Sequence, residues 1–256
     1  MKSFFYLFCF LLCFSEYIFP QKTLTAIITD PQIGSENGET FLNSISKDIN
    51  QHKEIDRVIV LGNLTAPGLH DEFDQIKAIL DGMDKEYFVT GGSNDYLLSE
   101  LNGLEIVQLW GNDTYNISSN GYDIYIINTI NKHTANGNLE IETLDWLKNN
   151  SENTNNVNLI FSFYPINEVY NGYKLTNNFA GEKIISFSAN HYKKQKKKPG
   201  TDEIKTKKLS ESKKWNYQVL SVVNDSLIYY NVSEKDIVLK LISILPIANM
   251  EFISKV

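Results

Sequence analysis

Leu24-Thr25-Ala26-Ile27-Ile28-Thr29 is a short apolar run of the kind that forms a buried strand. Two similar runs follow, Arg57–Leu61 and Glu86–Thr90, and both end in glycine and polar residues. Between the three runs, Glu39–His52 and Asp71–Leu80 carry apolar residues at helical spacing. Strands alternating with helices over about 70 residues predict a parallel sheet built from βαβ crossovers.

The second half of the chain has a different pattern, with more strands and fewer helices. The expected strands are Tyr122–Asn128, Val157–Phe163, Lys183–Ser188, Trp215–Val223 and Leu227–Val232, and the expected helix is Asn138–Lys148. The last two strands flank Asn224-Asp225-Ser226, which is a hairpin signal. The apolar tail Asp236–Ile247 fits either a strand or a helix.

Polar side chains gather where the predicted strands end. They are Asp30, Asn63, Asn94 with Asp95, and His191. In open α/β sheets, ligands bind outside the carboxyl ends of the strands. The sequence therefore places its candidate site at this edge of the sheet.

Five fragments at these strand ends resemble, in order, the motifs of the calcineurin-like metallophosphoesterases. The fragments are Thr29-Asp30-Pro31-Gln32, Leu61-Gly62-Asn63-Leu64-Thr65, Gly91-Gly92-Ser93-Asn94-Asp95, Phe161-Ser162-Phe163-Tyr164-Pro165 and Ser188-Ala189-Asn190-His191. The resemblance covers about residues 24–232. It implies an α/β fold with two packed, mostly mixed β-sheets flanked by helices, a four-layer sandwich forming one domain over residues 21–256.

The metal-binding residues of that family are mostly replaced in this chain. The resemblance places Asp30 at the first Asp and His191 at a surviving His. The replaced positions are Gln32 for a His, Asn63 for the Asp that bridges both metals, Ser93 for the Asn ligand, Asn94 for the catalytic His, and Phe163 and Ala189 for two further His. One inserted glycine leaves the register open, so Asn94 also fits the position of the Asn ligand.

The family's site holds two divalent ions that clamp a phosphate ester, and it needs carboxylates and imidazoles to offset their charge. The family pattern uses five histidines, whereas this chain has four, and only His191 falls at a motif. A full two-metal site cannot be built from this sequence, and no cofactor is expected. A single divalent ion held by Asp30 and His191 is the remaining possibility.

Each candidate residue also has a structural interpretation. Asp30 can cap a turn, Asn63 can bond to backbone in a turn, and Asn94 with Asp95 can form a tight turn rather than an anion-binding or sugar-binding loop. The first functional hypothesis is a non-catalytic relative of the phosphoesterases that acts as a binding or structural module. The alternatives are a weak phosphoesterase with one metal, or an unrelated α/β binding protein whose loops mimic the motif order.

The start of the chain resembles a secretory signal. Lys2 precedes an uncharged apolar run from Phe4 to Phe14, which is too short to span a bilayer comfortably. We expect residues 1–20 to be a signal peptide, the mature chain to have no transmembrane span, and the protein to be secreted or located in the periplasm or cell envelope. Both cysteines, Cys9 and Cys13, lie in this segment, so the mature chain would contain no disulfide.

A basic segment, residues 192–214, follows the last motif. It carries ten lysines against three acidic residues, a net charge of +7, so the remainder of the chain carries −14 within the total of −7. Such a segment, Lys193–Lys214 at its charged core, could attract an anionic ligand, although a solvated loop is the plainer interpretation. Nucleic acid is an unlikely partner, because only Tyr192 and Trp215 are available for base stacking.

Overall fold

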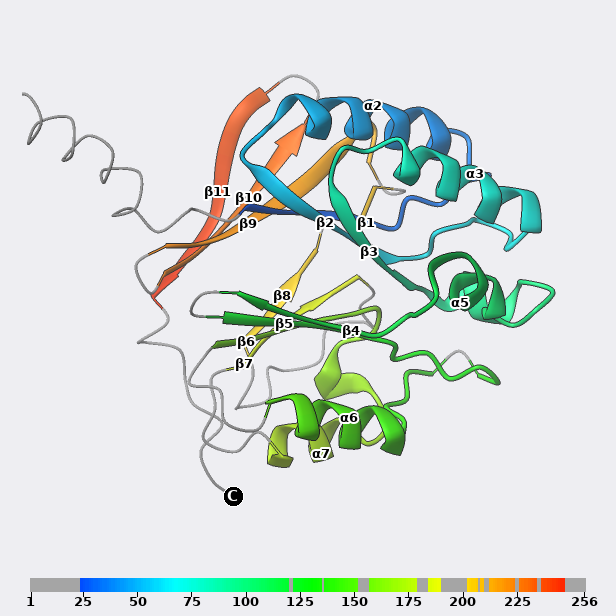
Figure 1. Cartoon of the computed structure of the whole chain (residues 1–256), viewed down its shortest axis with the longest axis vertical. Coiled ribbons are helices and arrows are strands. Elements are labelled where there is room, and N and C mark those ends of the chain that lie inside the picture. The colour runs from blue at the N-terminus through cyan, green and yellow to red at the C-terminus, as the bar shows by residue number, and fades with distance from the viewer. Residues whose placement is uncertain are drawn as a thin grey trace, which may run out of the picture.

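The chain folds into four layers, with two β-sheets stacked between two pairs of helices. The computed structural model describes residues 24–119, 122–134, 136–151, 157–178, 184–189, 202–206, 208–209, 212–223, 226–233 and 236–246. Helices α2 (Gly38–Gln51) and α3 (His70–Asp81) cover the outer face of the first sheet, and α6 (Ile141–Ser151) and α7 (Gly172–Asn178) cover that of the second (Figure 1). This arrangement confirms the predicted α/β sandwich.

The first sheet is mixed and has six strands within the described residues, in the order β11-β10-β9-β1-β2-β3. The strands are β1 (Leu24–Thr29), β2 (Ile55–Gly62), β3 (Glu86–Gly91), β9 (Asn216–Val223), β10 (Ser226–Ser233) and β11 (Asp236–Pro246). β1, β2 and β3 pair in parallel, as predicted, and β9 and β10 form the predicted hairpin. The tail, left open between strand and helix, is a strand antiparallel to β10.

The second sheet is also mixed, with five strands among the described residues in the order β4-β5-β6-β7-β8. The strands are β4 (Tyr115–Ser119), β5 (Tyr122–Ile127), β6 (Val157–Ser162), β7 (Ile184–Ser188) and β8 (Asp202–Lys205). β5 to β8 are parallel, and β4 is antiparallel to β5. β8 lies in the basic segment. The interpretation of this segment as a solvated loop was therefore wrong for Asp202–Lys205, because their backbone pairs with β7.

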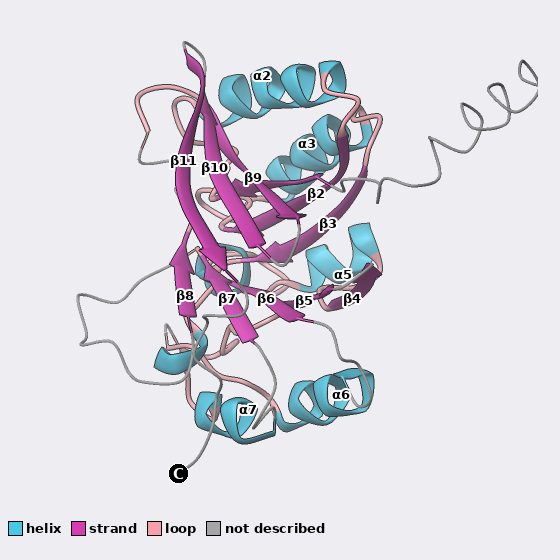
Figure 2. Ribbon diagram, turned by 90° about the vertical axis from the view of Figure 1, so that its left-hand side faces the viewer, coloured by secondary structure: helices cyan, strands magenta, loops and turns pink. Residues whose placement is uncertain are grey.

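The core explains why the apolar runs form these strands. All six residues of β1 are buried, as are all six of β5 and of β6, because sheets covered on both faces need near-continuous apolar strands. The two sheets meet through aromatic rings: Phe187 of β7 lies 5.7 Å from Tyr229 of β10, centroid to centroid, and stacks on Phe161 at 4.5 Å. Figure 2 shows the sheets one above the other, with helices on the outside.

Six short elements among the described residues were not predicted, namely α4 (Ser93–Leu97), α5 (Leu104–Trp110), β4, the 3-10 helix η1 (Ile166–Glu168), α7 and β8. α5 runs for seven residues between two glycines in the left-handed region, so its apolar pattern is too short to indicate a helix. α6 begins three residues later than expected, because the backbone of Asn138 and Leu139 pairs with Tyr170 instead.

The pairing register places the candidate loops at one edge. Thr29 of β1 is opposite Leu61 of β2, which is opposite Thr90 of β3, so the three strands end together. Residues 1–20 and His191 lie outside the described residues. None of the helices in the described part of the chain combines the length and apolar character that crossing a membrane requires.

Candidate functional site

Asp30 occupies the first position after β1 and is almost completely buried, with 1% exposure. Its backbone lies in the left-handed region, with φ of 53°, and that of Gln32 does too, with φ of 48°. An L-residue held there costs roughly 1–2 kcal/mol, so the surrounding contacts must fix this loop. The N–H of Asp30 donates to the carbonyl of Leu61, and its carboxylate Oδ1 accepts the N–H of Asn63 at 2.7 Å.

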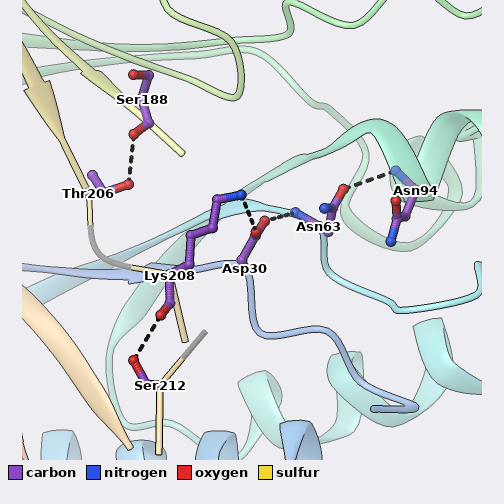
Figure 3. Close-up of polar contacts among 7 residues, drawn as sticks. All are labelled: Asp30, Asn63, Asn94, Ser188, Thr206, Lys208 and Ser212. Atoms are coloured by element: carbon purple, nitrogen blue, oxygen red, sulfur yellow. Dashed lines mark hydrogen bonds and ion pairs between the residues drawn. The ribbon is translucent and has the colours of Figure 1, made fainter. Parts of the chain in front are cut away.

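Asn63 and Asn94 continue this chain of hydrogen bonds across the sheet edge. The side-chain Oδ1 of Asn63 accepts the N–H of Asn94 at 2.9 Å, and Asn94 Nδ2 donates to the carbonyl of Ala66 at 2.8 Å. Asp30, Asn63 and Asn94 therefore connect the loops that follow β1, β2 and β3 (Figure 3). The structure brings together three of the residues that the sequence placed at this edge. The oxygens of Asp30 and Asn63 accept backbone N–H groups, and the amide nitrogen of Asn94 donates to a backbone carbonyl.

Lys208 is the residue at this site that the sequence did not single out. Its Nζ lies 3.4 Å from Asp30 Oδ2, and its side chain is 19% exposed against 1% for Asp30. The turn that carries it is fixed by two hydrogen bonds: Leu209 N–H donates to the carbonyl of Thr29 at 2.7 Å, and Ser212 Oγ donates to the carbonyl of Lys208 at 3.0 Å. Figure 3 shows the ammonium group meeting the carboxylate between the two sheets. A lysine of the basic segment thus balances the charge of the first motif.

Phe163 and Ala189, which replace histidines of the family pattern, are buried beside the same loops. A Cβ added to Gly62 would lie 3.0 Å from Ala189 Cβ and 2.4 Å from Asp30 Oδ1. A Cβ added to Gly92 would lie 2.7 Å from Phe163 Cε2 and 2.3 Å from Asn63 Oδ1. The described positions of all five motifs therefore converge, but two of them present apolar carbon where imidazole nitrogen would be needed.

We expect Gly92→Ala to lower the free energy of unfolding by about 2–3 kcal/mol, because its Cβ would overlap Asn63 and Phe163. Gly111→Ala is the matched control: its backbone φ is +77° and nothing lies within 4 Å of the added Cβ, so it should cost only the strain of about 1 kcal/mol. Urea unfolding of both variants measures the difference. Equal losses would contradict close packing around Asn63.

Asp95 belongs to the framework beneath the site. Its carboxylate is fully buried and accepts four hydrogen bonds, from the N–H groups of Gly92, Leu64 and Thr65 and from Thr65 Oγ1, at 2.7 to 2.9 Å. Burial raises the pKa of Asp95 to about 7, while these hydrogen bonds lower it. Asp95 joins the β2 and β3 loops, which agrees with its structural interpretation as a turn residue. Ser93, beside it, is half-buried, as is Gln32 in the β1 loop.

The described residues do not fit a two-metal centre. Among them, no three or more His, Cys, Asp or Glu side chains are grouped so that they could hold a metal ion. The carboxylate at the first motif is paired with an ammonium group, and the bridging carboxylate is replaced by the neutral Asn63, whose oxygen already accepts a hydrogen bond. The donors needed to offset the charge of two divalent ions are absent from this part of the chain.

A pocket of about 140 Å³ lies next to the site, between the loop before α2 and the turn after Lys208. It is lined by Pro31, Ser35, Glu36, Asn37, Gly38, Phe41, Leu209 and Ser212. Typical small-molecule sites have volumes of roughly 300–1,000 Å³. This pocket is therefore too small to enclose an ordinary substrate.

Comparisons with known proteins bear on the fold. No protein-family model and no curated protein sequence matches this chain. Among solved structures, the purple acid phosphatase PPD1 from yellow lupin seeds is similar with a TM-score of 0.60 and 12% identity, over 87% of this chain and 53% of the lupin chain, so this chain spans about half of that enzyme. GAP50, the anchor in the inner membrane complex of Plasmodium, is similar with a TM-score of 0.58 and 12% identity, over 88% of each chain. Together with the five converging motif positions, these likenesses identify the fold of the chain as that of the calcineurin-like metallophosphoesterases.

Proposed function

We propose that this protein is an exported, non-catalytic relative of the metallophosphoesterases that acts as a binding or structural module. The observation that carries the proposal is the contact between Lys208 Nζ and Asp30 Oδ2 at 3.4 Å. Two unit charges about 4 Å apart interact by roughly 4 kcal/mol at the effective dielectric constant of a protein surface. A divalent ion bound to Asp30 would meet roughly twice that repulsion from the ammonium group.

The remaining polar groups support the same conclusion. Asp30 Oδ1 already accepts the N–H of Asn63, and Asn63 Oδ1 already accepts the N–H of Asn94, so binding a metal through these oxygens would break bonds that hold the loops. Asn94 lies at the family's catalytic His position, but its amide does not transfer protons near neutral pH. Its Nδ2 also donates a hydrogen bond to the carbonyl of Ala66. These contacts support a site that works without a metal clamp or a general acid.

Two further observations support a binding role outside the cytoplasm. Lys2 and the apolar run Phe4–Phe14 have the order of a secretory signal. GAP50, which has the same fold over most of both chains, serves as an anchor, so the fold is compatible with a role in attachment. We propose such a role for this chain, with the fold retained and the chemistry lost.

Hydrolysis assays on the full-length protein test the proposal. We expect no turnover of p-nitrophenyl phosphate or bis-p-nitrophenyl phosphate above the buffer rate, with or without added Mn²⁺, and no difference between the wild-type chain and Asp30→Ala. A known phosphatase run in parallel validates the assay. Mn²⁺-dependent hydrolysis that is lost in Asp30→Ala would instead establish the alternative, a weak phosphoesterase with a single metal held by Asp30 and His191.

A further inference from the structure

The region around α4 and α5 exposes an unusual concentration of large apolar side chains. Their exposed fractions lie between 39% and 57%, and the residues are Leu69, Leu98, Leu101, Leu104 and Val107. Four of them fall within ten consecutive residues. We refer to these five residues as the leucine surface. Single exposed apolar residues are ordinary, but a cluster on a soluble protein marks an interaction site.

The segments that carry the leucine surface adjoin one another and are held by hydrogen bonds. A Cβ added to Gly68 would lie 2.7 Å from the backbone N of Ser99, so the segment carrying Leu69 abuts the turn after α4. That turn is fixed from inside by Glu105, which is 1% exposed and accepts hydrogen bonds from Ser99 Oγ at 3.2 Å and from Leu101 N–H at 3.1 Å. Figure 1 shows α5 next to α3 on one side of the molecule. The leucines are thus presented by a preformed turn.

α5 packs Ile106, Leu109 and Trp110 against the core, as an ordinary surface helix does, but its first turn departs from that pattern. It buries the acidic Glu105 together with Ile106, and it exposes Leu104 and Val107. A surface helix usually directs apolar residues to the core and charged residues to solvent. An outward apolar face beside a satisfied, buried carboxylate indicates that the outer face has a partner in the functioning protein.

Charge around the leucine surface limits what that partner can be. Asp71 and Asp74 at the start of α3, and Glu100 between the leucines, are exposed. Residues 86–131 contain no lysine or arginine at all. A second copy of this chain, docked by two-fold symmetry, would bring these acids against themselves, and an anionic lipid surface would repel them. A basic partner is complementary.

We propose that the leucine surface binds an amphipathic helix of a partner protein, with an apolar face flanked by lysine and arginine. The apolar face would cover the leucines, and the basic flanks would meet Asp71, Asp74 and Glu100. The proposal rests on the proposed function as a binding module and gives that module a contact surface and a class of partner.

Binding of a synthetic peptide to the full-length protein tests the proposal. The probe is a fluorescent helix of about 18 residues, five turns, with leucine on one face and lysine on the other, and its control replaces every lysine with glutamate. We expect the wild-type chain to bind the lysine peptide at least about tenfold more tightly than the glutamate peptide, and the double variant Leu98→Ser/Leu104→Ser to lose at least about tenfold in affinity for the lysine peptide. Both serines replace exposed side chains, so stability should change little.

Ile141→Ser is the matched control, because Ile141 is 56% exposed on α6 in the opposite outer layer. It should leave peptide binding unchanged. No binding by the wild-type chain, or equal losses in Ile141→Ser and the double variant, would overturn the proposal. So would a leucine-dependent dimer in light scattering, which would assign the surface to a second copy, or leucine-dependent binding to phosphatidylserine vesicles, which would assign it to a membrane. None of these results depends on hydrolysis, so each is separable from a failure of the proposed function.

Discussion

Lys208→Ala is expected to lower the free energy of unfolding by about 3 kcal/mol, with a fall in melting temperature of roughly 6–12 °C. The variant leaves the Asp30 carboxylate in a site that is 1% exposed without its ammonium partner. Removing one member of a buried ion pair is costly because the remaining charge stays desolvated. Asp30 keeps its bond from Asn63, which places the expected loss at the lower end of the range for such pairs.

A double-mutant cycle separates this pair from general effects of the substitution. Asp30→Asn removes the negative charge, so Lys208→Ala should cost much less in that background than in the wild type. Lys214→Ala, at an exposed lysine of the same basic segment, should stay within about 0.5 kcal/mol of the wild type. Equal costs of Lys208→Ala in both backgrounds would show that the ion pair contributes nothing.

Asp95→Ala should have the largest effect of any single substitution considered for this protein, at least about 4 kcal/mol, which approaches the whole stability of many domains. The variant would leave the N–H groups of Gly92, Leu64 and Thr65 without their acceptor in a fully buried place. Each unsatisfied buried donor costs about 1–3 kcal/mol. Urea unfolding followed by circular dichroism measures the loss.

Asp95→Asn and Asp74→Ala serve as controls for that prediction. The amide in Asp95→Asn keeps one acceptor but turns its NH₂ toward backbone donors, so it should recover only part of the stability. Asp74 is an acid whose side chain is 58% exposed, and its loss should change stability by no more than about 0.5 kcal/mol. A stable Asp95→Ala variant would contradict the role of this carboxylate in joining the loops.

The apolar runs predict most strands of the two sheets, because strands buried on both faces need near-continuous apolar residues, whereas β4 and β8 have no such run. β1 is the clearest case: all six residues are buried, and its predicted bounds agree with the structure. α4 and α5 show no comparable sequence pattern, since five and seven residues are too few to establish a helical period. The sequence therefore predicts the layers well and the short elements at the site edge poorly.

The candidate site likewise contains residues that the sequence predicts and residues that it does not. Asp30, Asn63 and Asn94 could be found because strand ends of a parallel sheet meet at one edge. Lys208 could not, because it is one of ten lysines in the basic segment and only the turn bonded to Thr29 brings it to Asp30. Asp95 looks like any turn acid in sequence, and its part as an acceptor for two loops depends on contacts 30 and 31 residues away.

The proposed function depends on Lys208, rather than a metal ion, balancing the charge of Asp30. The most direct test is the metal content of the full-length protein after incubation with excess Mn²⁺, Zn²⁺ and Fe²⁺ and removal of unbound ions by gel filtration. We expect far less than one ion per chain, with no change in Asp30→Ala. One or two ions per chain that disappear in Asp30→Ala would contradict this expectation.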